Sequence, residues 1–152
     1  MERLGKYLYT TLCFVMFLFA DLFISGYLAN HYIGLNHNNP LLKLTYIKNS
    51  GAAFNILPNS REFLIILSVV AITLFAVYIV RHVKGIRYLE LFFIAMLSAG
   101  IAGNLHERII YGFVRDFFQL KFINFPVFNV SDILITIGVV IWAIIIIAKK
   151  AR

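Results

Sequence analysis

Four long apolar stretches dominate this sequence, and each is long enough to cross the hydrocarbon core of a membrane, which takes about 20 mostly apolar residues. Apolar residues make up 61% of the chain and charged residues 14%, whereas a typical soluble domain carries about 25% charged residues. The 152 residues suit one domain. We therefore predict a single all-α integral membrane domain over residues 1–152, with spans at 7–29, 62–80, 88–105 and 130–148.

The first stretch also has the basic start of a secretory leader, at Arg3 and Lys6. Its apolar part is longer than the usual 7–15 residues of such a leader. It also contains Asp21, an acid that a disposable segment has no reason to hold. We therefore expect the stretch to be a retained span.

Basic residues predict the orientation, because Lys and Arg collect in the short cytoplasmic flanks of membrane proteins. Eight of the 14 basic residues lie before the first span, between the second and third, and after the fourth: Arg3, Lys6, Arg81, Lys84, Arg87, Lys149, Lys150 and Arg152. A four-span chain places these segments on one side, so both termini should be cytoplasmic. The net charge of +7 then reflects topology and attraction to anionic lipid, and we predict no nucleic-acid partner.

Two longer loops, at about residues 30–61 and 106–129, should then face outward. The first has partial apolar alternation and predicts one or two strands, a small β-rich element. The second is rich in phenylalanine and predicts an amphipathic segment that lies on the bilayer surface. An interfacial aromatic belt is the simpler interpretation of the same residues. A lid that includes Phe117 and Phe118 is a further hypothesis.

The three aspartates are few and oddly placed for so apolar a chain. Asp21 lies late in the first span, Asp116 in the second outer loop, and Asp132 at the start of the fourth span. All three can meet at the outer membrane boundary. A charge within a span is costly, so such residues are usually functional or paired. A catalytic carboxylate pair, ion pairs with Arg108 or Arg115, and an ion or proton pathway all fit this placement.

Two carboxylates that share a site of low dielectric constant titrate as a unit, and one keeps its proton near neutral pH. The ionised member can take a proton from water, and the protonated member can donate to a carbonyl oxygen. This is the chemistry of aspartic proteases. It needs no metal or cofactor, and we predict none.

Five short motifs, in order along nearly the whole chain, resemble those of the lipoprotein signal peptidase (signal peptidase II) family. They are Asp21 late in the first span; Asn-x-Gly-Ala-Ala-Phe at 49–54; Gly-Asn-x-x-Glu-Arg at 103–108; Gly-x-Val-x-Asp-Phe at 112–117; and Phe-Asn-x-Ser-Asp at 128–132. Each motif is weak alone, but five in order within a matching topology are specific. The resemblance implies a four-span bacterial aspartic endopeptidase of the inner membrane. Such an enzyme removes signal peptides from diacylglyceryl-modified prolipoproteins, cutting before the lipidated cysteine.

The resemblance also implies roles for individual residues. The catalytic dyad would be Asp116 and Asp132. Polar residues that bind substrate or orient the dyad would be Asn49, Gly51, Asn104, Arg108 and Asn129. Asp21 would be a structural acid that ties the first span to the outer loops, and Glu107 would be structural through a pair with Arg108. From the residues alone, Asn129 is a helix N-cap candidate and Asn49 a turn residue.

Three positions depart from the family pattern. Ser25 stands where a Lys usually follows the first aspartate, so Asp21 must find another partner or be protonated. Glu107 replaces an Asp and is one methylene longer. Ser131 replaces an Ala and adds a hydroxyl beside the dyad.

Other classes of protein fit the sequence less well. The four histidines lack zinc-ligand spacing, and no serine-protease motif or Lys within a span is present. A small transporter would need a polar track, yet the second and third spans have almost no polar residues at their centres. A catalytically inactive lipoprotein-binding relative stays open. We expect a monomer whose partners are the prolipoprotein and membrane lipid.

Overall fold

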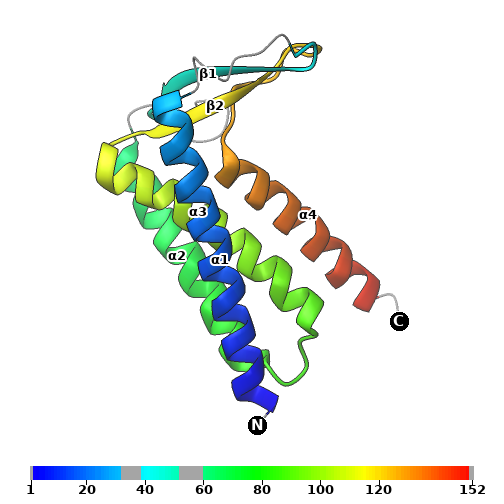
Figure 1. Ribbon diagram of the computed structural model, residues 1–152. Coiled ribbons are helices and arrows are strands. Elements are labelled where there is room, and N and C mark those ends of the chain that lie inside the picture. Colours follow the sequence, from blue (N-terminus) through cyan, green and yellow to red (C-terminus); the bar gives the residue numbers. More distant parts are fainter. Residues whose placement is uncertain (1, 32–38, 52–59, 151–152) are drawn as a thin grey trace.

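The computed structural model describes residues 2–31, 39–51 and 60–150. The chain order is α1 (Glu2–His31), β1 (Leu42–Asn49), α2 (Arg61–His82), α3 (Tyr88–Tyr111), β2 (Val114–Leu120) and α4 (Val130–Lys150). Figure 1 shows the two strands together at one end of a helical bundle, with the N-terminus, the α2–α3 turn and the C-terminus toward the other end. Among the described residues, four helices are long and apolar enough to cross a membrane, which confirms the predicted fold class.

Helix α3 is the centre of the bundle and packs against α1, α2 and α4. Small residues allow its close approach to α4. A Cβ on Gly100 would lie 2.6 Å from the carbonyl oxygen of Ser131, and one on Gly138 would lie 2.8 Å from Leu97 Cβ. Small residues at helix contacts are the usual means of tight packing in membranes, where lipid is as apolar as the side chains.

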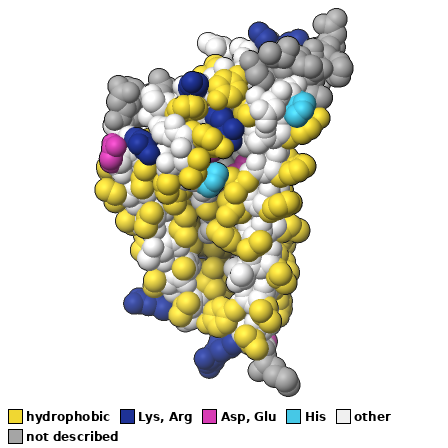
Figure 2. Space-filling model, turned by 60° about the vertical axis from the view of Figure 1, so that its left-hand side comes forward, with side chains coloured by type: hydrophobic (Ala, Val, Ile, Leu, Met, Phe, Trp, Pro, Cys, Tyr) yellow, Lys and Arg dark blue, Asp and Glu magenta, His cyan; other side chains and the backbone are white. Residues whose placement is uncertain are grey.

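The outer faces of the other helices remain apolar and exposed. Figure 2 shows a broad hydrophobic belt along the helices, with Lys and Arg near its two ends. Large exposed apolar side chains include Leu12, Phe19, Leu74, Val80 and Ile147. In a soluble protein such a continuous surface would be an aggregation hazard, whereas lipid tails cover it without cost.

The two strands form an antiparallel sheet whose register changes along its length. Leu44 is opposite Phe118, whereas Ile47 is opposite Asp116, so β1 contains one extra residue between these two pairs. An extra residue of this kind is a β-bulge, and it reverses which face the following side chains occupy. Strand β1 falls where the sequence predicted one or two strands.

The second outer loop differs from its prediction, because part of it is strand β2. Phe117 is wholly buried and packs edge-on against Tyr46, so it is not a lid residue. Phe118 pairs with Phe128 through backbone hydrogen bonds in both directions, at 2.8 and 3.0 Å. The aromatic composition had indicated a membrane-surface segment, but β1 supplies backbone partners that the local sequence does not reveal.

Helix α3 extends beyond the predicted end of the third span at residue 105. It stops at Gly112, which has a φ of 85° and donates its N–H to the Arg108 carbonyl. Glycine favours this left-handed geometry at helix ends. Arg61 donates to the carbonyls of Arg108 and Ile109, at 2.9 and 3.2 Å. These contacts satisfy carbonyls of the last turn, which have no partner within the helix.

The opposite end of the bundle holds a buried acid that the sequence analysis did not single out. Glu90 is fully buried, forms an ion pair with Lys149 and accepts a hydrogen bond of 3.1 Å from the Tyr78 hydroxyl. Lys6 donates to the carbonyls of Val83 and Lys84, at 3.2 and 3.1 Å. These contacts join the start of α1, the α2–α3 turn and the end of α4.

Candidate active site

The bulge in β1 brings Asn49 to Asp116. Asp116 lies opposite Ile47, and side chains two residues apart on a strand share a face. Asn49 therefore lies on the face of Asp116, and its Nδ2 donates to Asp116 Oδ2 at 3.0 Å. Without the extra residue, Asn49 would point to the other face. Its Oδ1 accepts the Gly51 N–H at 2.9 Å, an Asx turn that fixes the side chain.

The start of α4 positions Asp132. The Asp132 N–H donates to Asn129 Oδ1 at 2.8 Å, and the Asn129 N–H donates to Asp132 Oδ2 at 3.2 Å. This reciprocal arrangement is a capping box in which Asn129 is the N-cap and the aspartate occupies the third helical position. The N-cap interpretation of Asn129 is correct, and the same contact holds the Asp132 carboxylate.

Two asparagine amides connect the two carboxyl groups. Asn129 Nδ2 donates to Asp116 Oδ1 and to Asn104 Oδ1, both at 3.0 Å. Asn104 Nδ2 in turn donates to Asp132 Oδ1 at 3.1 Å. Strand β2, the end of α3 and the start of α4 each contribute to this chain of hydrogen bonds. It brings together residues that are up to 28 positions apart in sequence.

The environment of Asp116 favours its protonated form. The residue is 2% exposed, and burial raises its pKa to about 7. Asn49 and Asn129 lower the pKa by donating to the carboxylate, and the negative charge of Asp132 raises it. Within the described part of the chain, neither Asp116 nor Asp132 forms an ion pair, so simple pairing with Arg108 or Arg115 is not the role of these acids.

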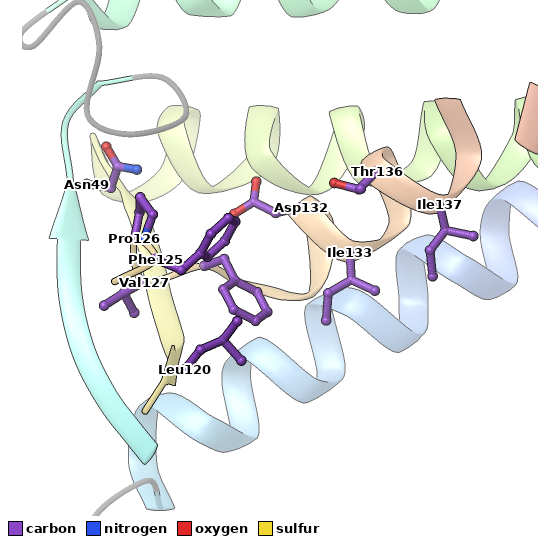
Figure 3. Close-up of a pocket in the computed structure, with 10 residues that line it drawn as sticks. Asn49, Leu120, Phe125, Pro126, Val127, Asp132, Ile133, Thr136 and Ile137 are labelled. Carbon is purple, nitrogen blue, oxygen red and sulfur yellow. The ribbon is translucent and has the colours of Figure 1, made fainter. Parts of the chain in front are cut away.

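An apolar cavity of about 340 Å³ opens beside Asp132. Figure 3 shows Asp132 and Asn49 near one side of it, with Phe125, Ile133 and Ile137 among the other lining residues. The lining comes from both strands, the segment after β2 and the first turns of α4: Asn49, Leu120, Phe125, Pro126, Val127, Phe128, Asp132, Ile133, Thr136 and Ile137. Asp132 and Asn49, two polar residues at the edge of an apolar cavity, suit a substrate with both peptide and lipid character.

Comparisons with known proteins identify relatives of this chain. The family model described as signal peptidase (SPase) II matches residues 12–148. The lipoprotein signal peptidase of Streptococcus thermophilus (strain CNRZ 1066) is 41% identical over 106 residues, 70% of this chain and 69% of that protein. The corresponding protein of Lactococcus lactis subsp. lactis (strain IL1403) is 37% identical over 110 residues, 72% of both chains.

This chain belongs to the signal peptidase II family. A solved structure of a bacterial membrane enzyme also matches it, with a TM-score of 0.79 and 27% identity over 94% of this chain and 89% of that one. The resemblance drawn from the five motifs is thereby confirmed, and the chain is a bacterial multi-pass membrane protein with a protease fold.

The third motif works differently from the expectation drawn from the signal peptidase II pattern. The predicted pair of Glu107 with Arg108 is wrong. Glu107 instead binds the guanidinium of Arg115 on β2 through both carboxylate oxygens, with an Nε to Oε2 distance of 2.7 Å. This buried bidentate pair joins α3 to the strand that carries Asp116. Arg115 also lies 4.2 Å from the centre of the Tyr111 ring, a cation–π contact.

Arg108 points toward the first outer loop. Its guanidinium donates to the Gly51 carbonyl at 2.9 Å and to the Asn104 carbonyl at 3.2 Å. It thus connects Gly51, two residues after Asn49, with the helix that carries Asn104. Residues 52–54, the rest of the second motif, lie outside the described residues.

Asp21 contacts a different element from the one expected. It was predicted to tie the first span to the outer loops, but Ser131 Oγ on α4 donates to its Oδ2 at 2.6 Å. Because Ser25 stands where the family has a Lys, Asp21 needs another partner. That partner is the hydroxyl of Ser131, a residue that also departs from the family pattern. Sequence reasoning missed this contact and the role of Arg115, because both depend on which helices and strands become neighbours.

Proposed function

We propose that this protein is an aspartic endopeptidase that removes signal peptides from diacylglyceryl-modified prolipoproteins and cuts just before the lipidated cysteine. Family membership supports signal-peptide removal, and the relatives' name, lipoprotein signal peptidase, supports the substrate class. The observation that carries the proposal of an aspartic mechanism is the chain of amides joining Asp116 and Asp132 beside an apolar cavity.

Attack of a water molecule on the scissile peptide uses both carboxyl groups. Asp116 keeps its proton up to about pH 7, so we assign the ionised role to Asp132. Asp132 takes a proton from a water molecule, whose oxygen forms a bond to the carbonyl carbon of the scissile peptide. Asp116 donates its proton to the carbonyl oxygen, and a neutral tetrahedral diol results.

Collapse of the diol returns the dyad to its starting state. Asp132 passes its new proton to the peptide nitrogen, and Asp116 takes a proton back from one of the hydroxyl groups. The carbon–nitrogen bond then breaks, and the products are the signal peptide's carboxyl group and the amino group of the lipidated cysteine. Protons balance over the two steps, and the dyad is ready for another water molecule.

The neighbouring polar residues keep the dyad in position. Asn104 and Asn129 fix the orientation of the carboxylates by donating to them. Asn49 does the same from the strand side. Arg108 anchors the Gly51 carbonyl and so shapes the loop against which the substrate backbone would lie. Preorganised donors of this kind contribute most to catalysis where water is excluded.

We propose that the apolar cavity binds the hydrophobic part of the substrate. Its lining includes Ile133 and Ile137, one turn apart on α4 and 37% and 44% exposed, together with Phe125 and Phe128. A signal helix or an acyl chain arriving from the bilayer can enter without leaving an apolar environment. The scissile peptide then meets Asp132, the acid that lines the cavity.

The proposed location is the bacterial cytoplasmic (inner) membrane, with both termini cytoplasmic and the dyad at the outer face. Basic residues at the end of the bundle away from the sheet support this orientation. Substrate would then reach the dyad after its cysteine is exported and lipidated. We further propose that the protein acts as a monomer, because both acids and all of their amide partners come from one chain.

The alternatives are not favoured. A small transporter requires a polar path through the membrane, and the described polar cluster lies at one end of the bundle. The retained pair of buried acids, joined through amides, favours an active enzyme over an inactive lipoprotein-binding relative.

Cleavage of a lipidated prolipoprotein by the purified protein in detergent tests the proposal. The substrate is offered with and without its diacylglyceryl group, and the cleavage site is read by mass spectrometry. We expect cleavage of the lipidated form just before the cysteine. Binding of the lipidated substrate with no cleavage at any pH would establish the inactive relative instead.

A further inference from the structure

Three helices meet beside the dyad at a junction formed by Asp21, Gly103 and Ser131. Asp21 of α1 and Ser131 of α4 are each 2% exposed, and the serine hydroxyl donates to Asp21 Oδ2 at 2.6 Å. Gly103 of α3 is the third member. A Cβ at this position would overlap both Asp21 Oδ2 and Ser131 Oγ, so only glycine leaves room for the contact.

Among the described residues, Ser131 is the hydrogen-bond partner of the Asp21 carboxyl group, through its hydroxyl. Its other oxygen, Oδ1, is buried and has no hydrogen-bond partner among the described residues. A buried carboxyl group with few partners is costly. Nothing in the proposed reaction uses it, although it is held next to the residue that precedes Asp132.

Ser131 belongs to the first turn of α4, which carries Asp132. The N–H groups of a first turn have no partner within the helix, so its position depends on contacts from outside. Besides the amide of Asn104 that donates to Asp132 itself, the described contacts of this turn include the capping box of Asn129, the close approach of the Ser131 carbonyl to Gly100, and the hydroxyl bond to Asp21. The capping box acts along the chain, and the other two fix the turn against α3 and α1.

We propose that Ser131 and Asp21 are positioning residues for Asp132, which hold the first turn of α4 so that its carboxylate faces Asp116. This inference rests on the proposed peptidase function. Neither residue lines the substrate's cavity, and both are buried. A displacement of about 1 Å at a catalytic group can reduce the rate by about a hundredfold, so a partial relaxation of the turn has a smaller but measurable effect.

A purely structural link between α1 and α4 makes a different prediction. It would lower the unfolding temperature on removal and leave the turnover of folded enzyme unchanged. A positioning role lowers kcat while KM stays nearly the same, because neither Ser131 nor Asp21 lines the substrate's cavity. The two roles are therefore separated by the kinetic constants of the folded fraction.

The first variant is Ser131→Ala, assayed on a lipidated prolipoprotein peptide after purification of the folded fraction. We expect kcat to fall by about tenfold and KM to change by less than about twofold. The matched control is Ser98→Ala, which removes a buried hydroxyl from α3 at a cavity lined by Thr10 and Ile72, away from the dyad. Its kcat should stay within about twofold of the wild-type value.

Variants of Asp21 test the same hydrogen bond from the acceptor side, with one conservative change that keeps the bond and one that removes it. Asp21→Asn keeps an oxygen that accepts the Ser131 hydroxyl, so its kcat should stay within about threefold of wild type. Asp21→Val removes the acceptor and should match Ser131→Ala. The double variant Asp21→Val, Ser131→Ala should lose no more activity than either single variant, because both remove the same bond.

Each outcome decides a different point. If the wild-type protein cleaves no lipidated peptide, the proposed function fails. If the wild type cleaves and Ser131→Ala has the wild-type kcat, the positioning role is wrong while the function stands. Losses that multiply in the double variant, or an Asp21→Asn variant as impaired as Asp21→Val, would also overturn the positioning role.

Discussion

Glu90 at one end of the bundle and the two aspartates at the other hold their buried carboxyl groups in opposite ways. At the end near the N-terminus, Glu90 forms an ion pair with Lys149 and accepts a hydrogen bond from the Tyr78 hydroxyl. At the sheet end, Asp116 and Asp132 receive hydrogen bonds from neutral amides. An ion pair joins helices, whereas amide donors fix a carboxylate without supplying a full opposite charge. In the second arrangement burial raises the pKa of Asp116 to about 7, so a proton can move near neutral pH.

The largest effect should come from the dyad itself. Asp116→Asn and Asp132→Asn each remove a group that transfers a proton, so kcat should fall by about a thousandfold or more. Peptide cleavage by each purified variant measures this. A variant that retains a tenth of wild-type turnover would show that its acid is not catalytic.

Unfolding temperatures show whether the loss of kcat in Asp116→Asn comes from the missing acid or from misfolding. The folded-state pKa of Asp116, about 7, lies above the ordinary value of 3.8. Ionisation of this group therefore destabilises the folded protein as the pH rises from 3.8 through 7. Asp116→Asn removes that penalty, so at a pH above 7 it should unfold at the wild-type temperature or higher.

The next effect is a decline in activity at alkaline pH. Because Asp116 must hold a proton for the attack step, kcat/KM should fall about tenfold per pH unit above about pH 7. Initial rates at low substrate concentration, from about pH 5 to pH 9, measure this limb. A rate that stays constant across the alkaline half of this range would contradict the assignment of the proton to Asp116.

Removal of one amide that donates to Asp116 should shift the alkaline limb of the pH dependence of kcat/KM. Asn49 lowers the pKa of Asp116 by donating to its charged form. In Asn49→Ala the pKa should therefore rise, and the alkaline limb should shift to higher pH. The lost contact should also reduce kcat/KM by about tenfold. A shift to lower pH would show that Asn49 acts through something other than this hydrogen bond.

The smallest effect on activity should come from the opposite end. Glu90→Gln removes the ion pair with Lys149 and should lower the free energy of unfolding by about 1–2 kcal/mol, because Lys149 partly reaches solvent. Its kcat should remain unchanged. Thermal unfolding and peptide cleavage measure the two quantities, with Glu62→Gln as an exposed control. Loss of turnover in Glu90→Gln would show that the two ends are coupled.

The sequence predicted the class of fold because hydrocarbon thickness demands long apolar stretches, and four are present. Acids in so apolar a chain are costly unless functional, and the resemblance in motif order singled out Asp116 and Asp132 rather than Asp21. The structure joins these two acids through amides, and their catalytic role stays a prediction. Asn129 was readable as an N-cap. These inferences depend on local composition, spacing and motif order, which a sequence displays directly.

Only the tertiary structure determined the contacts between distant elements. The bulge that turns Asn49 toward Asp116, the strand at residues 114–120, and the partners of Glu107 and Asp21 all depend on which elements become neighbours. Glu107 and Arg108 are adjacent in sequence, yet successive residues on a helix point about 100° apart, so each binds a different element. A sequence supplies the charged groups, but packing of the helices and strands selects their partners.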